Sequence, residues 1–198
     1  MAAAAPVSPW NLANYLTVLR LLLVPVFLAV LFARGGQDAG LRLIAAAVFV
    51  LAALTDRIDG QIARSRGLVT SFGKLMDPIA DKALIGAALI GLSLLGELPW
   101  WVTVLVLVRE IGVTLLRLVV LRHGVLPSGR GGKLKTALQG VALTLYLLPL
   151  SGVLHTGAGV LMAVAVLLTV VTGVEIVVRA LVLRATSERA ETKRRRRA

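Results

Sequence analysis

The sequence predicts an all-α polytopic membrane protein whose helices cross the bilayer six times. Of its 198 residues, 58% are hydrophobic and only 16% are charged, and its mean hydropathy is +0.88. Apolar runs of roughly 20 residues recur along the chain, and a helix of about that length crosses a hydrocarbon core of about 30 Å. Little polar sequence separates these runs. We therefore expect residues 1–185 to form one membrane domain and residues 186–198 to form a basic cytoplasmic tail.

The first three spans are predicted at residues 11–33, 41–65 and 71–95. Pro9 and Trp10 precede the first span, as suits a helix that begins at a membrane interface. A glycine-rich loop, RGGQDAG, separates the first span from the second.

The last three spans are predicted from the GELPWW turn to about residue 122, then at residues 133–150 and 157–183. The two tryptophans of the turn favour a membrane interface, and HGVLPSGRGG separates spans four and five. The polar sequence that follows residue 183 ends in KRRRR. We expect it to be a mobile tail that anionic lipid headgroups attract.

The charges of the connecting segments predict how the spans are oriented. Basic residues gather around the 2–3 and 4–5 connections and in the tail, whereas the 3–4 and 5–6 turns hold few charges. Because basic residues accumulate on the cytoplasmic side of membrane helices, both termini are predicted to be cytoplasmic. Arg34 and Arg42, beside Asp38 around the 1–2 loop, are the exception to this pattern.

The net charge of +12 would suggest a nucleic-acid partner in a soluble protein. We expect none here, because the basic tail follows a membrane span and carries no interleaved aromatic residues. The chain contains no cysteine, which excludes disulfides and thiolate metal sites.

Four aspartates stand at helical spacing around the 2–3 connection. Asp56 and Asp59 are three residues apart on span two, and Asp77 and Asp81 are four apart on span three, so each pair shares a helix face. A short connection makes the two spans a hairpin, and four clustered carboxylates near a bilayer require compensation. Hard divalent cations supply it, because they prefer carboxylate and phosphate oxygens.

Other interpretations of these aspartates remain open. They would also be explained by ion pairs at a solvated helix end with nearby basic residues, namely Arg57, Arg64, Lys74 and Lys82. A cation or proton pathway is another alternative, since acids within membranes also mark transporters. The chain shows no inverted repeat or pair of broken helices that would support transport.

The pattern Asp56-x2-Asp59-Gly60-x2-Ala63-Arg64-x8-Gly73-x3-Asp77-x3-Asp81 resembles the signature of the CDP-alcohol phosphatidyltransferases at every defined position. Members of that family transfer a phosphatidyl group from a CDP-linked lipid to an alcohol and release CMP. The resemblance implies that Asp56, Asp59, Asp77 and Asp81 bind one or two Mg²⁺ or Mn²⁺ ions. It also implies that Asp81 is the general base for the attacking hydroxyl.

The resemblance implies further properties of the chain. The residues that shape the site for the CDP-lipid, CDP-diacylglycerol, would be Gly60, Ala63, Arg64 and Gly73. The protein would be a homodimer in the inner membrane of a bacterial cell, with the active site facing the cytoplasm.

Four segments indicate the acceptor alcohol. NLANYLTVLRLLLVPVF, FGKLMDPIADK, REIGVTLLR and GGKLKTALQ resemble bacterial phosphatidylglycerophosphate synthases, although Ala13 stands where those enzymes commonly have proline. The resemblance implies that the acceptor is sn-glycerol 3-phosphate, a dianion that needs a basic pocket. The candidates for that pocket lie on spans four and five: Arg109, Arg117, Lys133 and Lys135.

Structural roles compete with this assignment. Arg109 lies in the middle of a span and needs a partner, for which Asp56, Asp59 and Glu175 are candidates. The neighbouring Glu110 is expected to pair poorly with Arg109, because adjacent helical residues point about 100° apart. Arg117, Lys133 and Lys135 are alternatively anchors at the cytoplasmic face.

Other polar residues of the spans are assigned less specific roles. Glu175 and Arg179, four apart on span six, are expected to form a structural pair. In span one, Asn11, Asn14 and Thr17 suggest a polar stripe that faces the cavity of the site, and Arg20 either extends to the interface or reaches the cytidine site.

Two related enzymes and one non-enzyme stay as alternatives. A cardiolipin synthase of the same family would use phosphatidylglycerol as acceptor, and a phosphatidylinositol-phosphate synthase would use a phosphorylated polyol. LMDPIADK and REIGVTLLR argue against the second. A cation or proton transporter would release no CMP, which separates it from all of these enzymes.

Overall fold

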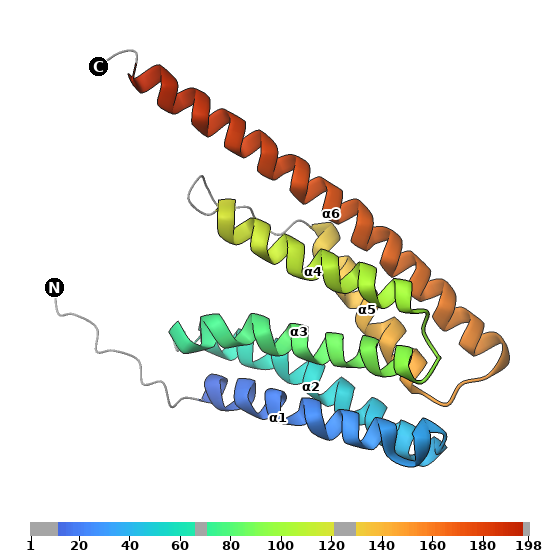
Figure 1. The fold of residues 1–198 in the computed structure, drawn as a ribbon. Coiled ribbons are helices and arrows are strands. Elements are labelled where there is room, and N and C mark those ends of the chain that lie inside the picture. The colour runs from blue at the N-terminus through green and yellow to red at the C-terminus, as the bar shows by residue number, and fades with distance from the viewer. Residues whose placement is uncertain (1–11, 66–70, 121–129, 196–198) are drawn as a thin grey trace. The chain divides into compact units, whose positions relative to one another are not determined.

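The computed structural model describes residues 12–65, 71–120 and 130–195, and its regular structure there is entirely helical (Figure 1). Side chains at several helix ends, among them those of residues 56–65 and 185–195, lie outside this description. The elements are α1 (Leu12–Phe32), the short 3₁₀ turn η1 (Ala33–Gly36), α2 (Ala39–Ser65), α3 (Ser71–Leu94), α4 (Trp100–Val120), α5 (Arg130–Leu147) and α6 (Gly152–Arg195). These bounds agree closely with the six predicted segments, apart from both ends of α6, which begins at Gly152 and not near residue 157.

The chain forms two compact units. The first takes in the chain up to Trp100 together with Leu143–His155, and so contains α1, α2 and α3. The second takes in Trp101–Ala142 and the chain from Thr156 onward, and so contains nearly all of α4 and most of α5 and α6.

In the first unit, α1 packs against both α2 and α3. Phe27 and Phe49 meet with ring centroids 5.9 Å apart, and both side chains are buried. Small residues let the helices come close: a methyl group on Gly91 of α3 would lie 2.7 Å from a methyl carbon of Leu31. The packing therefore depends on the absence of a side chain at this point.

The connection between α1 and α2 is a tight turn with an unusual backbone. Arg34, Gly35 and Gly36 all have positive φ angles, of 52°, 69° and 73°, which glycine adopts at little cost and arginine does not. Asp38 then caps α2, because its Oδ1 accepts a hydrogen bond of 3.0 Å from the backbone amide of Leu41. This hydrogen bond, with the nearby guanidinium of Arg34, lowers the pKa of the Asp38 carboxyl.

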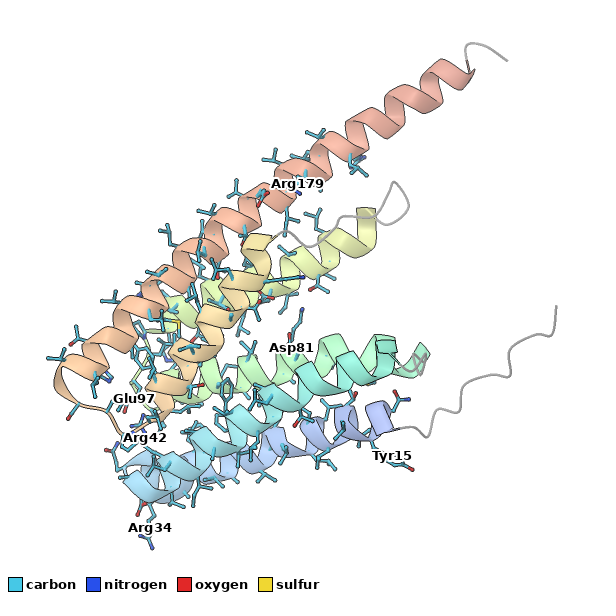
Figure 2. The ribbon with its side chains drawn as sticks, turned by 180° about the vertical axis from the view of Figure 1, so that it is seen from behind. Tyr15, Arg34, Arg42, Asp81, Glu97 and Arg179 are labelled. Atoms are coloured by element: carbon cyan, nitrogen blue, oxygen red, sulfur yellow. The ribbon has the colours of Figure 1, made fainter. Side chains whose placement is uncertain are left out.

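Arg42, in the first turn of α2, joins three segments of the first unit (Figure 2). Its Nη1 donates to Glu97 Oε1 at 2.5 Å, and its Nη2 and Nε donate to the carbonyl oxygens of Tyr146 and Leu147 at 2.6 and 3.3 Å. Those carbonyls belong to the last turn of α5, where a helix leaves acceptors without intrahelical donors. Of the two arginines that depart from the predicted charge pattern, Arg42 is therefore held in a buried structural contact, whereas Arg34 is exposed.

Two of the described helices are long and apolar enough to cross a membrane: Asn14–Gly36, which ends in the η1 turn, and Gly152–Arg184 of α6. Ala39–Thr55 of α2 is a shorter apolar helix. Many large apolar side chains of these helices are exposed, including Leu22, Leu51 and Leu167. A soluble protein rarely exposes so much contiguous apolar surface, so these faces are suited to lipid.

The end of α6 differs from the prediction. The helix does not stop near Leu183 but continues to Arg195, so most of the expected mobile tail is helical. The prediction treated polarity as a sign of mobility. The sequence after Leu183 is nevertheless rich in alanine, arginine, glutamate and lysine, which favour a helix and can extend one that is already formed.

Candidate functional site

The four aspartates of the motif occupy two helices that contact each other within the first unit. Asp56 and Asp59 lie in the C-terminal half of α2, and Asp77 and Asp81 lie in the N-terminal half of α3. The chain connects these halves through residues 66–70, so both pairs belong to the same end of a helical hairpin (Figure 1). The predicted hairpin is confirmed at the level of these helices.

Of these four side chains, the structure describes that of Asp81, which is half-buried on α3 (Figure 2). The side chains of Asp56, Asp59 and Asp77 lie outside the described residues, as do those of Arg64 and Ala63. Gly60 and Gly73 carry no side chain, and the structure places their backbone in α2 and α3. The predicted ligand set and donor site therefore stay predictions, supported by the helices on which the residues stand.

The donor set suits a hard divalent cation. All four candidate ligands are carboxylates, at i,i+3 and i,i+4 spacing on two contacting helices, and such oxygens are what Mg²⁺ and Mn²⁺ accept. Among the described side chains no three histidine, aspartate or glutamate residues gather closely enough to hold a metal ion, and that set includes only one member of the motif.

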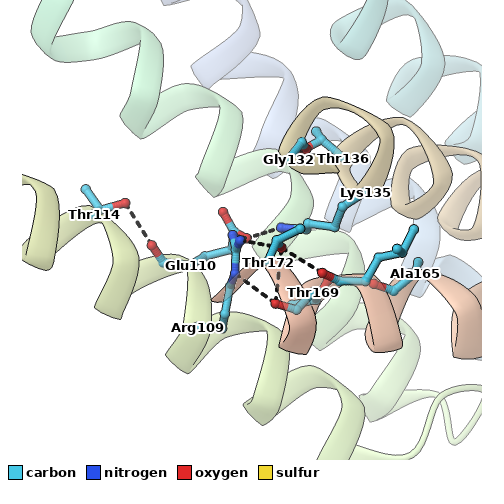
Figure 3. A network of polar contacts seen from close by, with 10 residues as sticks. Arg109, Glu110, Thr114, Gly132, Lys135, Thr136, Ala165, Thr169 and Thr172 are labelled. Atoms are coloured by element: carbon cyan, nitrogen blue, oxygen red, sulfur yellow. Dashed lines mark hydrogen bonds and ion pairs between the residues drawn. The ribbon is translucent and has the colours of Figure 1, made fainter. Parts of the chain in front are cut away.

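A second polar cluster lies in the second unit, where α4, α5 and α6 each contribute to it (Figure 3). Glu110 Oε1 accepts hydrogen bonds from Arg109 Nη1, at 2.8 Å, and from Lys135 Nζ. Arg109 also donates from Nη2 to Thr172 Oγ1 at 2.8 Å and from Nε to the carbonyl oxygen of Thr169 at 3.2 Å. We call Arg109, Glu110, Lys135, Thr169 and Thr172 the basic cluster.

The cluster is largely shielded from solvent. The side chains of Lys135, Arg109 and Glu110 are 3%, 14% and 23% exposed. Hydrogen bonds between ionised groups are shorter and stronger than neutral ones, and burial strengthens them further. The cluster is therefore a defined arrangement of charges rather than a set of mobile surface residues.

The prediction that Glu110 pairs poorly with Arg109 is wrong. It considered only the directions in which the two side chains leave the helix. Both side chains are long enough to turn back toward one point, and Lys135 on the neighbouring α5 attracts the carboxylate to the same place. Glu175, one of the partners considered for Arg109, instead pairs with Arg179 at 2.5 Å, which confirms the predicted i,i+4 pair.

The four predicted acceptor-binding residues separate in the structure. Arg109 and Lys135 share a carboxylate, whereas Lys133 is exposed on α5. Residues that are two positions apart in a helix point about 200° apart around its axis, so Lys133 and Lys135 face different sides of α5. Arg117 lies two turns after Arg109 on α4, and its side chain is outside the described residues.

Sequence reasoning assigned no role to Glu110 in the site and did not consider Thr169 or Thr172. The two threonines lie three residues apart, on one face of an otherwise apolar part of α6. This spacing on one helix face was the sequence feature from which a polar site on α6 could have been predicted. Both hydroxyl groups also donate to carbonyl oxygens one turn earlier, Ala165 and Leu168, each at 2.6 Å.

The polar residues of α1 are buried within the first unit. Asn14, Thr17 and Arg20 are all nearly inaccessible, and Arg20 is only 1% exposed. Arg20 therefore does not extend to a solvated interface, and that interpretation is wrong. Of the predicted stripe, Asn14 and Thr17 face the interior of the unit, where polar groups need hydrogen-bonding partners, and Asn11 lies outside the described residues.

Comparisons with known proteins agree with both the motif and the acceptor segments. A family profile described as CDP-alcohol phosphatidyltransferase matches residues 10–171. A "Probable phosphatidylglycerophosphate synthase" of Mycobacterium tuberculosis is 62% identical over 171 residues, which cover 86% of this chain and 82% of the relative.

Two further relatives are named CDP-diacylglycerol–glycerol-3-phosphate 3-phosphatidyltransferase. The one from Bacillus subtilis is 39% identical over 179 residues, covering 84% of this chain and 93% of the relative. The one from Rickettsia typhi is 39% identical over 169 residues, which cover 82% of this chain and 93% of the relative.

Proposed function

The chain belongs to the CDP-alcohol phosphatidyltransferase family, and on that premise we propose that it transfers the phosphatidyl group of CDP-diacylglycerol to sn-glycerol 3-phosphate. The products are phosphatidylglycerophosphate and CMP, and the reaction is a step of phospholipid biosynthesis. The observation that carries this assignment is the 62% identity, over 86% of the chain, to a protein named as a phosphatidylglycerophosphate synthase.

The aspartate motif is proposed to hold the reacting end of the CDP-lipid. Asp56, Asp59, Asp77 and Asp81 would bind one or two Mg²⁺ or Mn²⁺ ions, which neutralise the pyrophosphate when bound. Gly60, Ala63, Arg64 and Gly73 would shape the site for the cytidine diphosphate group. Support comes from the placement of all these residues at one end of the α2–α3 hairpin.

The chemical step is a substitution at the phosphorus that carries the diacylglycerol. The acceptor hydroxyl oxygen forms a bond to this phosphorus, and the bond from phosphorus to the bridging oxygen breaks. CMP leaves with the electron pair, and the hydroxyl proton passes to the carboxylate of Asp81 and then to solvent. Asp81 is a candidate for this role because it is half-buried on α3, one turn after Asp77.

Basic residues of α4 and α5 are proposed to bind the phosphate of the acceptor. They are Arg109, Arg117, Lys133 and Lys135. The convergence of Arg109 and Lys135 in a mostly buried cluster supports this part of the proposal, because a phosphate dianion needs shielded cationic donors.

We also propose that the protein is embedded in the bacterial inner membrane with six spans, both termini and the active site facing the cytoplasm, and that it forms a homodimer. The two long apolar helices and the exposed apolar side chains support the membrane location. The contact of Arg42 with Glu97 and the end of α5 supports the alternation of spans. It joins the start of α2, the 3–4 turn and the 5–6 turn, which six alternating spans place on one side.

The test is CMP release by the purified protein with CDP-diacylglycerol and Mg²⁺, with each acceptor supplied separately. Turnover with sn-glycerol 3-phosphate alone is expected. Turnover only with phosphatidylglycerol or only with an inositol phosphate would keep the chemistry and replace the acceptor. Folded protein that releases no CMP with any acceptor would contradict the enzymatic assignment and favour transport.

A further inference from the structure

Glu110 is the centre of the basic cluster, although it is not one of the proposed substrate-binding residues. One of its oxygens, Oε1, accepts a hydrogen bond from Arg109 on its own helix and another from Lys135 on α5. A single carboxylate oxygen therefore fixes two cations that come from different helices (Figure 3).

Arg109 is held from a second direction by α6. Its Nε and Nη2 donate to Thr169 and Thr172, so three of its nitrogens have defined acceptors. The Thr172 hydroxyl donates to the carbonyl oxygen of Leu168 at 2.6 Å, which leaves the lone pairs of Oγ1 for the guanidinium. The guanidinium thus has one orientation, which presents Nη1 to Glu110.

The backbone of α6 is shaped to admit this arginine. A methyl group on Gly173 would lie 3.3 Å from Arg109 Cγ and 3.4 Å from its Nε, closer than ordinary side-chain contacts. Likewise, a methyl group on Gly131 of α5 would lie 3.1 Å from Cγ2 of Thr172. Glycine at both positions lets α5 and α6 approach the cluster closely.

A lysine ammonium ends a flexible four-carbon chain, whose position is set by whatever accepts its hydrogens. Lys135 is only 3% exposed, and its contact with Glu110 helps to fix where its charge lies. Removing the Glu110 charge would leave two shielded cations close together without the carboxylate they share, and repulsion would move them apart.

We propose that Glu110 is a positioning residue that holds Lys135 and Arg109 in the arrangement that receives the phosphate of the acceptor. Glu110 acts through these two cations and does not itself contact the substrate. This inference rests on the proposed function, which assigns both cations to the acceptor, and it adds the residue that orders them.

Steady-state kinetics of Glu110→Gln tests the proposal. The substitution keeps the side-chain volume and removes the charge. The KM for sn-glycerol 3-phosphate should rise about tenfold or more, while kcat and the KM for CDP-diacylglycerol stay within about threefold. Glu110→Asp should recover part of the lost affinity.

A merely structural role would give a different result. It would lower the amount of active protein, and so the apparent kcat, with both KM values unchanged. That outcome, or a parallel rise in both KM values, would overturn the proposal. Glu175→Gln is the matched control, because it removes a carboxylate from the exposed pair with Arg179 in the same unit, and it should leave all three parameters unchanged.

Gly173→Ala provides a second variant that removes no charge and no hydrogen-bonding group. It should shift Arg109 by a few tenths of an ångström and raise the KM for the acceptor about threefold. Gly140→Ala is its control, because a methyl group there meets nothing within 4 Å, and it should leave the KM unchanged. Equal KM values for the two alanine variants would contradict the proposal, even if Glu110→Gln failed to fold.

Equilibrium dialysis with radiolabelled sn-glycerol 3-phosphate separates this proposal from the proposed function. If the unaltered protein released no CMP, the proposed function would fail, and binding alone would decide the role of Glu110. Binding to the unaltered protein that weakens about tenfold in Glu110→Gln supports the proposal. Equal binding by both proteins, or none by the unaltered protein, overturns it.

Discussion

Arg42 and Glu97 lie 55 residues apart in the sequence and form an ion pair of 2.5 Å, with side chains that are 10% and 23% exposed. The arginine is also the hydrogen-bond donor to two carbonyl oxygens at the end of α5. The Arg42 side chain therefore supplies hydrogen-bond donors both to the Glu97 carboxylate and to carbonyl oxygens at the C-terminus of α5. Its charge is neutralised locally, so it does not conflict with a cytoplasmic location for the other basic segments.

Replacing Arg42 by methionine is expected to destabilise the protein by about 3 kcal/mol. The change leaves Glu97 and the two carbonyl oxygens without this donor in a shielded place. Unfolding of the purified protein in detergent would measure the loss. Arg34→Met is the control, because Arg34 is 78% exposed in its pair with Asp38 and should cost about 0.5 kcal/mol or less. Equal effects of the two substitutions would contradict a structural role for Arg42.

The Asp38 cap should make stability depend on acidity. The backbone amide of Leu41 and the guanidinium of Arg34 lower the pKa of the Asp38 carboxyl below its ordinary value of about 3.9. Because the pKa of Asp38 is lower in the folded protein than in the unfolded chain, its ionised carboxylate stabilises the fold at pH values above the pKa of the unfolded chain. This stabilisation is lost as the pH falls through the pKa that Asp38 has in the folded protein.

Thermal unfolding of the protein and of Asp38→Asn between about pH 5 and pH 2 would measure this dependence. Asparagine still caps α2 but does not titrate, so the variant should lose less stability than the unaltered protein as the pH falls. Curves that stay parallel over that range would show that the carboxylate of Asp38 contributes nothing in this window.

Each of Asp56→Asn, Asp59→Asn and Asp77→Asn should abolish turnover that depends on a divalent ion, because each removes a proposed metal ligand. CMP release with increasing Mg²⁺ would measure the effect. Chelation of the metal should abolish CMP release by the unaltered protein, and adding Mg²⁺ back should restore it. Asp38→Asn is the control and should keep its full response to Mg²⁺, because Asp38 lies at the other end of α2.

Asp81→Asn should impair turnover far more than binding of the CDP-lipid, because Asp81 is proposed to accept the proton of the hydroxyl. Binding of the donor, measured without an acceptor, and CMP release would be compared in the same preparation. Equal losses in the two measurements would leave Asp81 as a ligand and remove its role as a base.

The two lysines of α5 should differ in their effect on the acceptor. Lys135→Met is expected to raise the KM for sn-glycerol 3-phosphate about tenfold, because Lys135 belongs to the shielded basic cluster. Lys133→Met should raise it about threefold or less, because Lys133 is exposed. Initial rates at varied acceptor concentration would measure both. A larger effect at Lys133 would place the acceptor on another face of α5.

Gly36→Ala should destabilise the protein more than Gly35→Ala. Both residues have positive φ angles, so alanine at either is strained by about 1 kcal/mol. At Gly36 the added methyl group would also lie 2.7 Å from a methyl carbon of Leu95, whereas at Gly35 it would meet nothing within 4 Å. Thermal unfolding of the two variants would compare them, and equal losses would show that Leu95 moves aside without cost.

The sequence predicted the helices well because apolar runs and glycine-rich or proline-containing connections alternate along the chain. It failed at the end of α6, where polar residues were read as mobile although they favour a helix. The partners of Arg42 were beyond prediction, since they lie 55 and about 105 residues away and depend on how three segments meet.

The candidate site was predictable to a different degree in its two parts. The aspartate motif was found from the spacing of residue types alone, and the structure adds the two contacting helices that carry it. The basic cluster was only half found. Arg109 and Lys135 were named for their charge, but Glu110 was set aside by a rule that considers backbone directions and ignores the reach of long side chains.

The length of α6 has a consequence for the arginines near its end. Its 44 residues, at a rise of 1.5 Å each, make a rod of about 66 Å, roughly twice the thickness of a hydrocarbon core. The arginines near its end therefore continue a helix, and they lie beyond the length that one crossing of that core requires.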